Sequence, residues 1–285
     1  MQPVRASLGL ATVNWRVLGT AALWTLNGVG LAIIAVAFFA ADVGFDWELY
    51  VEAGRRFQEG NLYDWGPQVS FRYSPVLAGL FAVIAPIGYV GWTALHFASL
   101  LTLPRRLALL CLASFPFWAD IYNGNTMTFV VVSAVAGLRG NRLGAVIFIT
   151  LAMLMPRPLM LPIAIYLLWR MREIIPIFAV VLIAHATAVV ASGWGEAWIA
   201  NLVTRGADDL GSRGDFGPSL LFGPWWYPVG LASALFLLVR RRFGLASLAA
   251  SPYWLSHYFL VLVLEAVPST GERREAAVNE HGAPP

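Results

Sequence analysis

The sequence predicts an all-α, polytopic integral membrane protein, and its composition and charge pattern are the main reasons. Of the 285 residues, 59% are hydrophobic and 12% are charged, whereas about a quarter of the residues in a soluble domain are charged. The basic residues are all arginine, and they stand in small clusters between apolar runs. Such clusters are typical of membrane-loop anchors and argue against a nucleic-acid-binding face. The one cysteine, Cys111, excludes a disulfide scaffold and a multi-cysteine metal site.

The first apolar run, residues 17–41, contains no charged residue and follows Arg5 and Arg16. We interpret it as the first transmembrane helix, with its N-terminus in the cytoplasm because basic residues favour that side. A cleaved signal peptide is the alternative, since Ala40 and Ala41 supply small residues near a junction, but the run is longer than a typical signal segment.

Eight further uncharged runs lie at 73–104, 107–119, 121–138, 143–156, 158–169, 174–195, 216–239 and 243–264. At about 20 residues per crossing, they and the first run predict nine or ten transmembrane helices. The run at 73–104 must cross an odd number of times if the later arginine clusters all face the cytoplasm. Because Pro86, Gly88 and Gly91 interrupt it, we expect a kinked or partly re-entrant helix there.

With this orientation, four loops face outward, at 42–72, 119–125, 156–158 and 193–216. We expect residues 1–267 to form a single membrane domain. A polar tail follows at 268–285, and its composition predicts disorder.

The outer loop at 42–72 predicts an amphipathic helix. The pattern from Asp46 to Glu59 is helical, and Gly60 follows as a C-cap candidate. The spacing pairs Glu52 with Arg56 and Arg55 with Glu59 on one side. A second side carries Asp46, Tyr50, Ala53, Gly54 and Phe57. We expect this helix to lie on the outer membrane surface.

Among the carboxylates of this loop, Asp46 is the candidate for chemistry. It stands at the helix start, on the side of Tyr50, whereas we expect Glu48, Glu52 and Glu59 to face water. Asp42 competes for the same role but lies nearer the end of the first transmembrane helix.

Three short motifs follow one another in this loop: Asp46-x-x-x-Tyr50, Gly60-x-Leu62-Tyr63-Asp64 and Phe71-x-Tyr73-x-Pro75. Their order resembles the first-loop signature of glycosyltransferase family 87, which comprises polyprenol-phosphate-sugar-dependent enzymes of the GT-C superfamily, including alpha-mannosyltransferases. The resemblance implies a GT-C-like bundle with an aspartate of the first outer loop as the catalytic base. Asp46 matches that base, and Tyr50, Tyr63 and Tyr73 become candidate substrate-binding residues.

Two more segments carry the resemblance. Asn123-Gly124-Asn125 is similar to a Gly-Gln-x-Asn element of the family, and a turn with an N-cap is the alternative. Arg157 stands where the family places a basic residue, usually lysine, that could hold the lipid phosphate. An arginine suits this role because its guanidinium binds phosphate as a bidentate fork. The alternative is a short outer loop with an arginine that snorkels to water.

A stretch near the C-terminus, Ser251-Pro252-Tyr253-Trp254-Leu255-Ser256-His257, resembles the family's Ser-Pro-x-x-Trp-x-His stretch. It makes His257 a candidate substrate-binding residue, with a packed structural histidine as the alternative. We expect His96 and His185, which lie in apolar runs without a motif, to be structural. Asp208 and Asp209 have no second acidic cluster beside them, so we expect no metal or other cofactor.

These features predict a membrane glycosyltransferase that moves a sugar, mannose by the resemblance, from a polyprenyl-phosphate donor to a hydroxyl of a glycolipid, glycan or protein acceptor. Asp46 would take the acceptor proton and Arg157 would stabilise the departing phosphate; by the resemblance, the anomeric carbon is inverted. We expect a bacterial plasma (inner) membrane location with the active site on the outer face. A catalytically inactive GT-C-like protein and a polyprenyl-phosphate lipid transporter or flippase are the alternatives, although a transporter should show repeat symmetry, which the sequence lacks.

Overall fold

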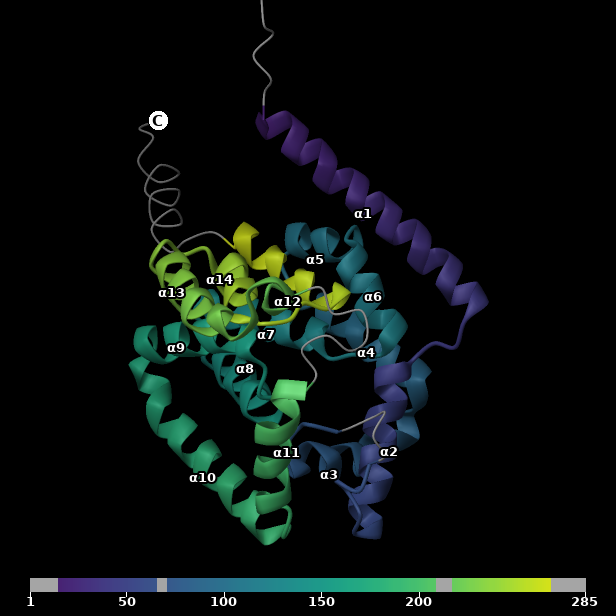
Figure 1. The fold of residues 1–285 in the computed structure, drawn as a ribbon, viewed down its shortest axis with the longest axis vertical. Helices are drawn as coiled ribbons and strands as arrows, with labels where there is room; N and C mark the ends of the chain where they lie inside the picture. The colour runs from purple at the N-terminus through teal and green to yellow at the C-terminus, as the bar shows by residue number, and fades with distance from the viewer. Residues whose placement is uncertain (1–14, 66–70, 209–216, 268–285) are drawn as a thin grey trace, which may run out of the picture.

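The computed structural model describes residues 15–65, 71–208 and 217–267 (Figure 1). Four expectations fall wholly or partly outside these residues. They concern the N-terminal Arg5, parts of the outer loops at 42–72 and 193–216, and the tail at 268–285.

Every regular element in the described ranges is a helix, so the all-α class is confirmed there. The α-helices are α1 (Trp15–Ala40), α2 (Phe45–Glu59), α3 (Pro75–Ile84), α4 (Gly88–Leu100), α5 (Arg105–Leu112), α6 (Phe115–Asn123), α7 (Met127–Leu138), α8 (Arg142–Leu154), α9 (Leu161–Arg170), α10 (Ile175–Ala191), α11 (Gly195–Asp208), α12 (Ser219–Phe222), α13 (Trp226–Val239) and α14 (Phe243–Ala250). The 3₁₀ helices are η1 (Ala85–Ile87), η2 (Pro158–Met160), η3 (Arg172–Ile174), η4 (Gly223–Trp225) and η5 (Ser256–Ala266).

Four apolar helical segments of 20 to 26 residues in the described chain are long enough to cross a membrane: Gly19–Ala40, Pro75–Leu100, Arg172–Ala191 and Ser219–Val239. Shorter apolar helices lie between them in sequence, including α7, α8 and α9. The chain is therefore a helical protein suited to a membrane. The count of nine or ten crossings and the GT-C arrangement stay predictions.

Two uncharged runs that we expected to cross as single helices are each divided. The run at 107–119 is split between α5 and α6, and the run at 243–264 is split between α14 and η5. Pro116 lies in the first turn of α6, and Pro252 follows the end of α14. Proline lacks the N–H that would continue the preceding helix, and Ser251 before Pro252 is extended, so each helix ends ahead of its proline.

The segment Pro75–Leu100 is bent at its middle, as the sequence predicted. Helix η1 separates α3 from α4, and Gly88 has a φ of 67°. The ring centroids of Phe81 and Trp92 lie 5.4 Å apart, although eleven residues on a straight helix would separate them by about 16 Å. The chain therefore bends between α3 and α4, which brings these two rings together, and Gly91 lies inside α4 without interrupting it.

Helix α2 has the two faces that its sequence predicted. Trp47, Tyr50, Ala53 and Gly54 are buried, whereas Glu52, Arg55, Arg56 and Glu59 form ion pairs on the outer side. The buried face packs on α3, where the Tyr50 and Phe81 rings stack with centroids 4.6 Å apart. A Cβ at Gly54 would lie 2.6 Å from the backbone nitrogen of Ala82, so glycine lets the two helix backbones approach. Gly60 caps the helix, with its N–H donated to the Arg56 carbonyl.

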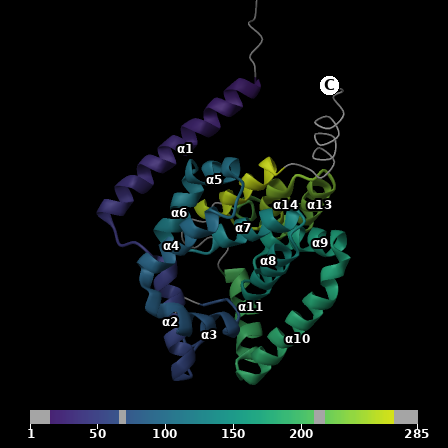
Figure 2. The same cartoon turned by 180° about the vertical axis from the view of Figure 1, so that it is seen from behind.

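Helix α1 lies obliquely along the outside of the bundle (Figures 1 and 2). Only 6% of its apolar window is buried. Its polar attachment is Asn27, which donates to the carbonyl of Ala113 at 3.0 Å and accepts from the N–H of Phe115 at 2.7 Å. Asn27 therefore satisfies backbone groups at the break between α5 and α6.

Helices α7, α8 and η2–α9 each run between the neighbourhood of Asn125 and Arg157 and an arginine-bearing end. One end of each lies beside Asn125 or Arg157, and the other ends at Arg139, Arg142 or Arg170. Contacts join the arginine-bearing ends, because Arg142 pairs with Glu173 at 3.5 Å and the Tyr166 and Phe243 rings lie 4.8 Å apart. The fold thus separates a site end from an arginine end.

Candidate active site

Asp46 lies at the start of α2, and the chain leading to it is held against α6. The N–H of Gly44 donates to the Tyr122 carbonyl at 2.7 Å, and Gly44 has a φ of 87°. Trp47 packs over Gly124, where a Cβ would lie 2.7 Å from the Trp47 Cβ. The turn after α6 thus requires glycine at 124, and it brings Asn125 next to Asp46.

Asn125 connects Asp46 to Arg157. Its amide nitrogen donates to Asp46 Oδ2 at 2.6 Å, and its amide oxygen accepts from Arg157 Nη1 and Nη2 at 3.2 and 3.3 Å. The Thr126 N–H donates to the same oxygen at 2.6 Å. Three residues that the sequence singled out in separate segments therefore meet in one hydrogen-bonded chain.

Arg157 is buried, with 4% of its surface exposed, so the snorkelling alternative is wrong. The guanidinium donates to the Tyr73 hydroxyl at 2.6 Å, and its Cζ lies 5.2 Å from the Tyr73 ring centroid and 5.5 Å from that of Tyr258. A buried arginine is stabilised by such acceptors and aromatic faces. Tyr73 and Tyr258 are therefore neighbours of Arg157, and the sequence did not indicate either contact.

Burial changes the acidity of Asp46. Removal of the carboxyl from water raises its pKa, while the Asn125 hydrogen bond and the positive charge of Arg157 act in the opposite direction. The residue as a whole keeps part of its surface exposed. A carboxylate with a raised pKa is a stronger proton acceptor, which suits a general base.

Several buried polar atoms around Arg157 have no hydrogen-bond partner. They are the Tyr50 hydroxyl, Arg157 Nε and both ring nitrogens of His257. Tyr50 lies against Tyr73 with ring centroids 5.8 Å apart, and His257 lies against Tyr258 at 5.0 Å. Because unpartnered buried polar groups are costly, their gathering beside a cation marks a place where a polar ligand or water would be stabilised.

Two other candidate residues lie outside this cluster. The Tyr63 hydroxyl donates to the Tyr73 carbonyl at 2.9 Å, so Tyr63 supports the backbone of a site residue. Asn123 donates to the Ala119 carbonyl of its own helix at 2.8 Å. Neither side chain contacts Asp46 or Arg157 through a bond that the structure records. Of the two asparagines in the motif, Asn125 is therefore the one in the cluster.

The sequence did not indicate Asp120 as a site neighbour. Its buried carboxylate accepts from the N–H groups of Met127 and Thr128 at 3.1 and 2.8 Å, and from the Thr128 hydroxyl at 2.6 Å. A signal was available, because Asp120 is the lone charge between two apolar runs, and such residues in membrane proteins are costly without a role.

An apolar cavity of about 960 Å³ lies between α10 and α11. Its lining includes Leu182, His185, Val189, Trp198 and Ile199. Its inner wall touches the segment leading to Tyr73, because the Trp198 indole donates to the Arg72 carbonyl at 3.2 Å and His185 Nε2 lies 3.5 Å from Ser74 Oγ.

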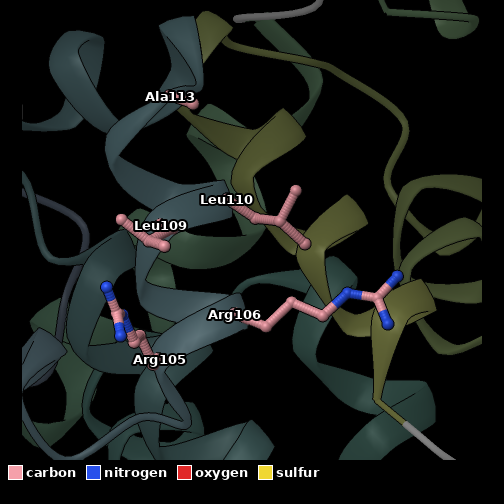
Figure 3. Close-up of a pocket in the computed structure, with 5 residues that line it drawn as sticks. All are labelled: Arg105, Arg106, Leu109, Leu110 and Ala113. Carbon is pink, nitrogen blue, oxygen red and sulfur yellow. The ribbon is translucent and has the colours of Figure 1, made fainter.

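A second cavity, of about 590 Å³, lies beside α5 and includes none of the candidate residues. Figure 3 shows Arg105 and Arg106 extending to opposite sides of that helix, with Leu109, Leu110 and Ala113 along it.

Within the described part of the chain, no three histidine, cysteine, aspartate or glutamate side chains gather closely enough to hold a metal ion. The side chains of Asp208 and Asp209 lie outside that part. Comparison with protein-family models, curated proteins and solved structures finds no match for this chain. The geometry of the Asp46, Asn125 and Arg157 cluster is therefore what supports a function.

Proposed function

We propose that this protein is a membrane glycosyltransferase of the GT-C type. It would transfer a sugar, mannose in the first instance, from a polyprenyl-phosphate donor to a hydroxyl of a glycolipid, glycan or protein acceptor. The observation that carries the proposal is the meeting of Asp46, Asn125 and Arg157. Asn125 is 79 residues from Asp46 and 32 residues from Arg157, and all three match motifs that resemble glycosyltransferase family 87.

In the proposed reaction, Asp46 takes the proton of the acceptor hydroxyl as the acceptor oxygen attacks the anomeric carbon. The Asn125 bond engages Asp46 Oδ2, which leaves Oδ1 for the proton. The bond between the anomeric carbon and the phosphate oxygen breaks, and its electron pair leaves with the polyprenyl phosphate. Attack from the face opposite the leaving group inverts the anomeric carbon.

Arg157 supplies the charge that stabilises the departing phosphate in this proposal. Its Nε–H has no protein acceptor and its positive charge is buried, so an anion beside it would be held strongly. Tyr50 and His257 have unpartnered polar atoms nearby that can complete the binding of the phosphate or sugar. The proposal assigns the charge to Arg157 and includes no metal ion.

Asn125 has a distinct role, because it bonds to both the base and the cation. Asp46 and Arg157 meet through an amide. A direct ion pair would lower the basicity of the carboxylate. The amide keeps both groups in place while leaving Asp46 basic enough to accept a proton.

The membrane arrangement follows from the two ends of α7, α8 and η2–α9. Arginine clusters favour the cytoplasm, so the arginine end would face inward and Asp46 and Arg157 would face outward. The α10–α11 cavity is apolar and reaches the residues beside Tyr73, so it would hold the polyprenyl chain while the phosphate lies near Arg157. We place the protein in the plasma (inner) membrane of a bacterium.

The deciding experiment measures sugar transfer from radiolabelled polyprenyl-phosphate mannose to a panel of hydroxyl acceptors, with the full chain in nanodiscs. The wild type should transfer, Asp46→Asn should not, and Glu48→Gln should match the wild type because Glu48 is exposed. Donor binding without turnover in the wild type would favour the inactive or transporter alternatives. Full turnover in Asp46→Asn would move the base elsewhere, with Asp42 next.

A further inference from the structure

His96 lies on α4, is completely buried, and contacts a main-chain carbonyl through each ring nitrogen. Nδ1 lies 2.8 Å from the Trp92 oxygen, and Nε2 lies 2.7 Å from the Asn125 oxygen. Both distances are those of good hydrogen bonds.

A carbonyl oxygen only accepts hydrogen bonds, so each ring nitrogen must donate. A neutral imidazole carries one N–H and one lone pair. Either neutral tautomer would therefore set a lone pair against the lone pairs of a carbonyl at less than 3 Å. The doubly protonated imidazolium donates to both oxygens and has no such conflict.

Asp120 provides the counter-charge. Its Oδ2 lies 3.6 Å from His96 Nε2, and both side chains have no exposed surface. The N–H groups of Met127 and Thr128 at the start of α7 donate to this carboxylate, so its negative charge is stabilised. The rings of Phe129 and Trp92, with centroids 4.4 and 5.3 Å from that of His96, add aromatic faces that attract a cation.

We propose that His96 is a buried imidazolium paired with Asp120, and that this pair positions Asn125. His96 holds the main-chain oxygen of Asn125, while the Asn125 side chain bonds to Asp46 and Arg157. His96 therefore acts through Asn125 and is a positioning residue. The effect of His96 on sugar transfer rests on the proposed function. The charge of His96 is inferred from its contacts and does not depend on that function.

The charge is tested by nitrogen NMR of the full chain in detergent, with ¹⁵N-labelled histidine, near neutral pH. The chain has four histidines, and His→Gln variants assign their signals. His96 should show two protonated ring nitrogens. His185 is the comparison, because its Nε2 faces the Ser74 hydroxyl, which can donate or accept. One unprotonated nitrogen on His96 in the wild type would overturn the proposal.

A second measurement uses thermal unfolding of His96→Gln, Asp120→Asn and the double variant. If the pair is ionic, each single variant leaves one buried charge without its partner, and the double variant should recover part of the lost Tm. Additive losses would contradict an ion pair.

A measurement of sugar transfer tests the positioning role of His96. In His96→Gln, turnover should fall while the protein stays folded, because the amide keeps one donor but not the charge. Normal turnover in that variant would overturn the positioning role and leave the imidazolium standing. If the wild type transfers no sugar, the proposed function fails, and the NMR result still decides the charge of His96.

Discussion

Asp46, the proposed general base, is expected to lower the stability of the fold at neutral pH. Its carboxyl has a raised pKa in the folded protein, because burial disfavours its charged form more than Asn125 and Arg157 favour it. For such an acid, the stabilising contribution is present below the unfolded pKa of about 3.9 and is lost as the pH rises through the folded pKa. At neutral pH, ionised Asp46 is therefore a net cost to folding.

Asp46→Asn should accordingly abolish sugar transfer. At neutral pH, the Tm of this variant should be slightly higher than that of the wild type. The asparagine oxygen can still accept from Asn125, while the buried charge is gone. The gain should shrink as the pH falls toward 4 and wild-type Asp46 becomes protonated. Thermal unfolding of both proteins over this pH range checks the prediction, and a large Tm loss in Asp46→Asn at neutral pH would make Asp46 a structural residue instead.

Two substitutions separate the contribution of the Arg157 charge from the contribution of its hydrogen-bonding geometry. Arg157→Lys should keep part of the turnover, because the charge survives although the fork that reaches Asn125 and Tyr73 is lost. Arg157→Met should lose donor binding and turnover together. The measurement is transfer and donor affinity in nanodiscs, with Arg139→Met, an exposed arginine of the other end, as the matched control. Full turnover in Arg157→Met would remove Arg157 from the site.

The sequence singled out the three residues that meet in the candidate cluster but not the residues that support them. Asp46, Asn125 and Arg157 belong to recognisable short motifs, and their partners proved to be one another. His96 and Asp120 belong to no motif. Their pairing depends on how α4 and α6 pack against each other in three dimensions. Neither residue spacing nor composition shows this packing. Tyr63 and Asn123 stand in motifs, yet one supports backbone and the other bonds within its own helix.

At the scale of elements, the all-helical class was predictable, but the 3₁₀ helices and the helix ends were less so. The extent of α2, its Gly60 cap and its ion pairs follow from local spacing, and the structure confirms them. The absence of charged residues identified the apolar runs. It did not show where one helix ends and the next begins within a run. The breaks at Pro116 and Pro252 arise from backbone geometry, which overrides hydrophobic continuity.

The contact between α2 and α3 depends on Gly54. A Cβ there would meet the backbone of Ala82, which cannot move aside as a flexible side chain would. Gly54→Ala should therefore destabilise the protein by about 1–3 kcal/mol and lower transfer, since α2 carries Asp46. Gly28→Ala is the matched control, because its Cβ would meet nothing within 4 Å and alanine favours a helix. Equal Tm values for the two variants would contradict this account.

The α10–α11 cavity should hold the hydrocarbon chain of the donor. Ala186→Trp places a bulky ring in that cavity, whereas Val180→Trp lies on the same helix outside its lining. Ala186→Trp should raise the KM for a long-chain polyprenyl-phosphate sugar and leave the KM for a short-chain analogue unchanged. Steady-state kinetics with both donors checks this. An unchanged KM for the long-chain donor would place the chain elsewhere.

At the scale of the whole molecule, the site end and the arginine end of α7, α8 and η2–α9 differ in chemistry. Which side of a membrane each end faces can be tested. Gln58 is exposed on α2 near the site end, and Arg139 is exposed at the arginine end. In a Cys111→Ala background, Gln58→Cys should react with an impermeant maleimide added outside intact cells. Arg139→Cys should react only after the membrane is opened. Labelling of both from the same side would contradict the proposed orientation. The single domain over 1–267 stays a prediction at this scale.

The attachment of α1 has a consequence for how the chain is made. Asn27 bonds to the N–H of Phe115, 88 residues later in the chain. A ribosome adds roughly 5–20 residues per second, so about 4–18 seconds pass between the synthesis of the two partners. During that interval α1 carries a polar amide in an apolar segment whose partner does not yet exist. The insertion machinery, or water at its edge, must satisfy Asn27 until α6 arrives, which makes this residue a site where a defect in biogenesis would appear while the finished protein looks intact.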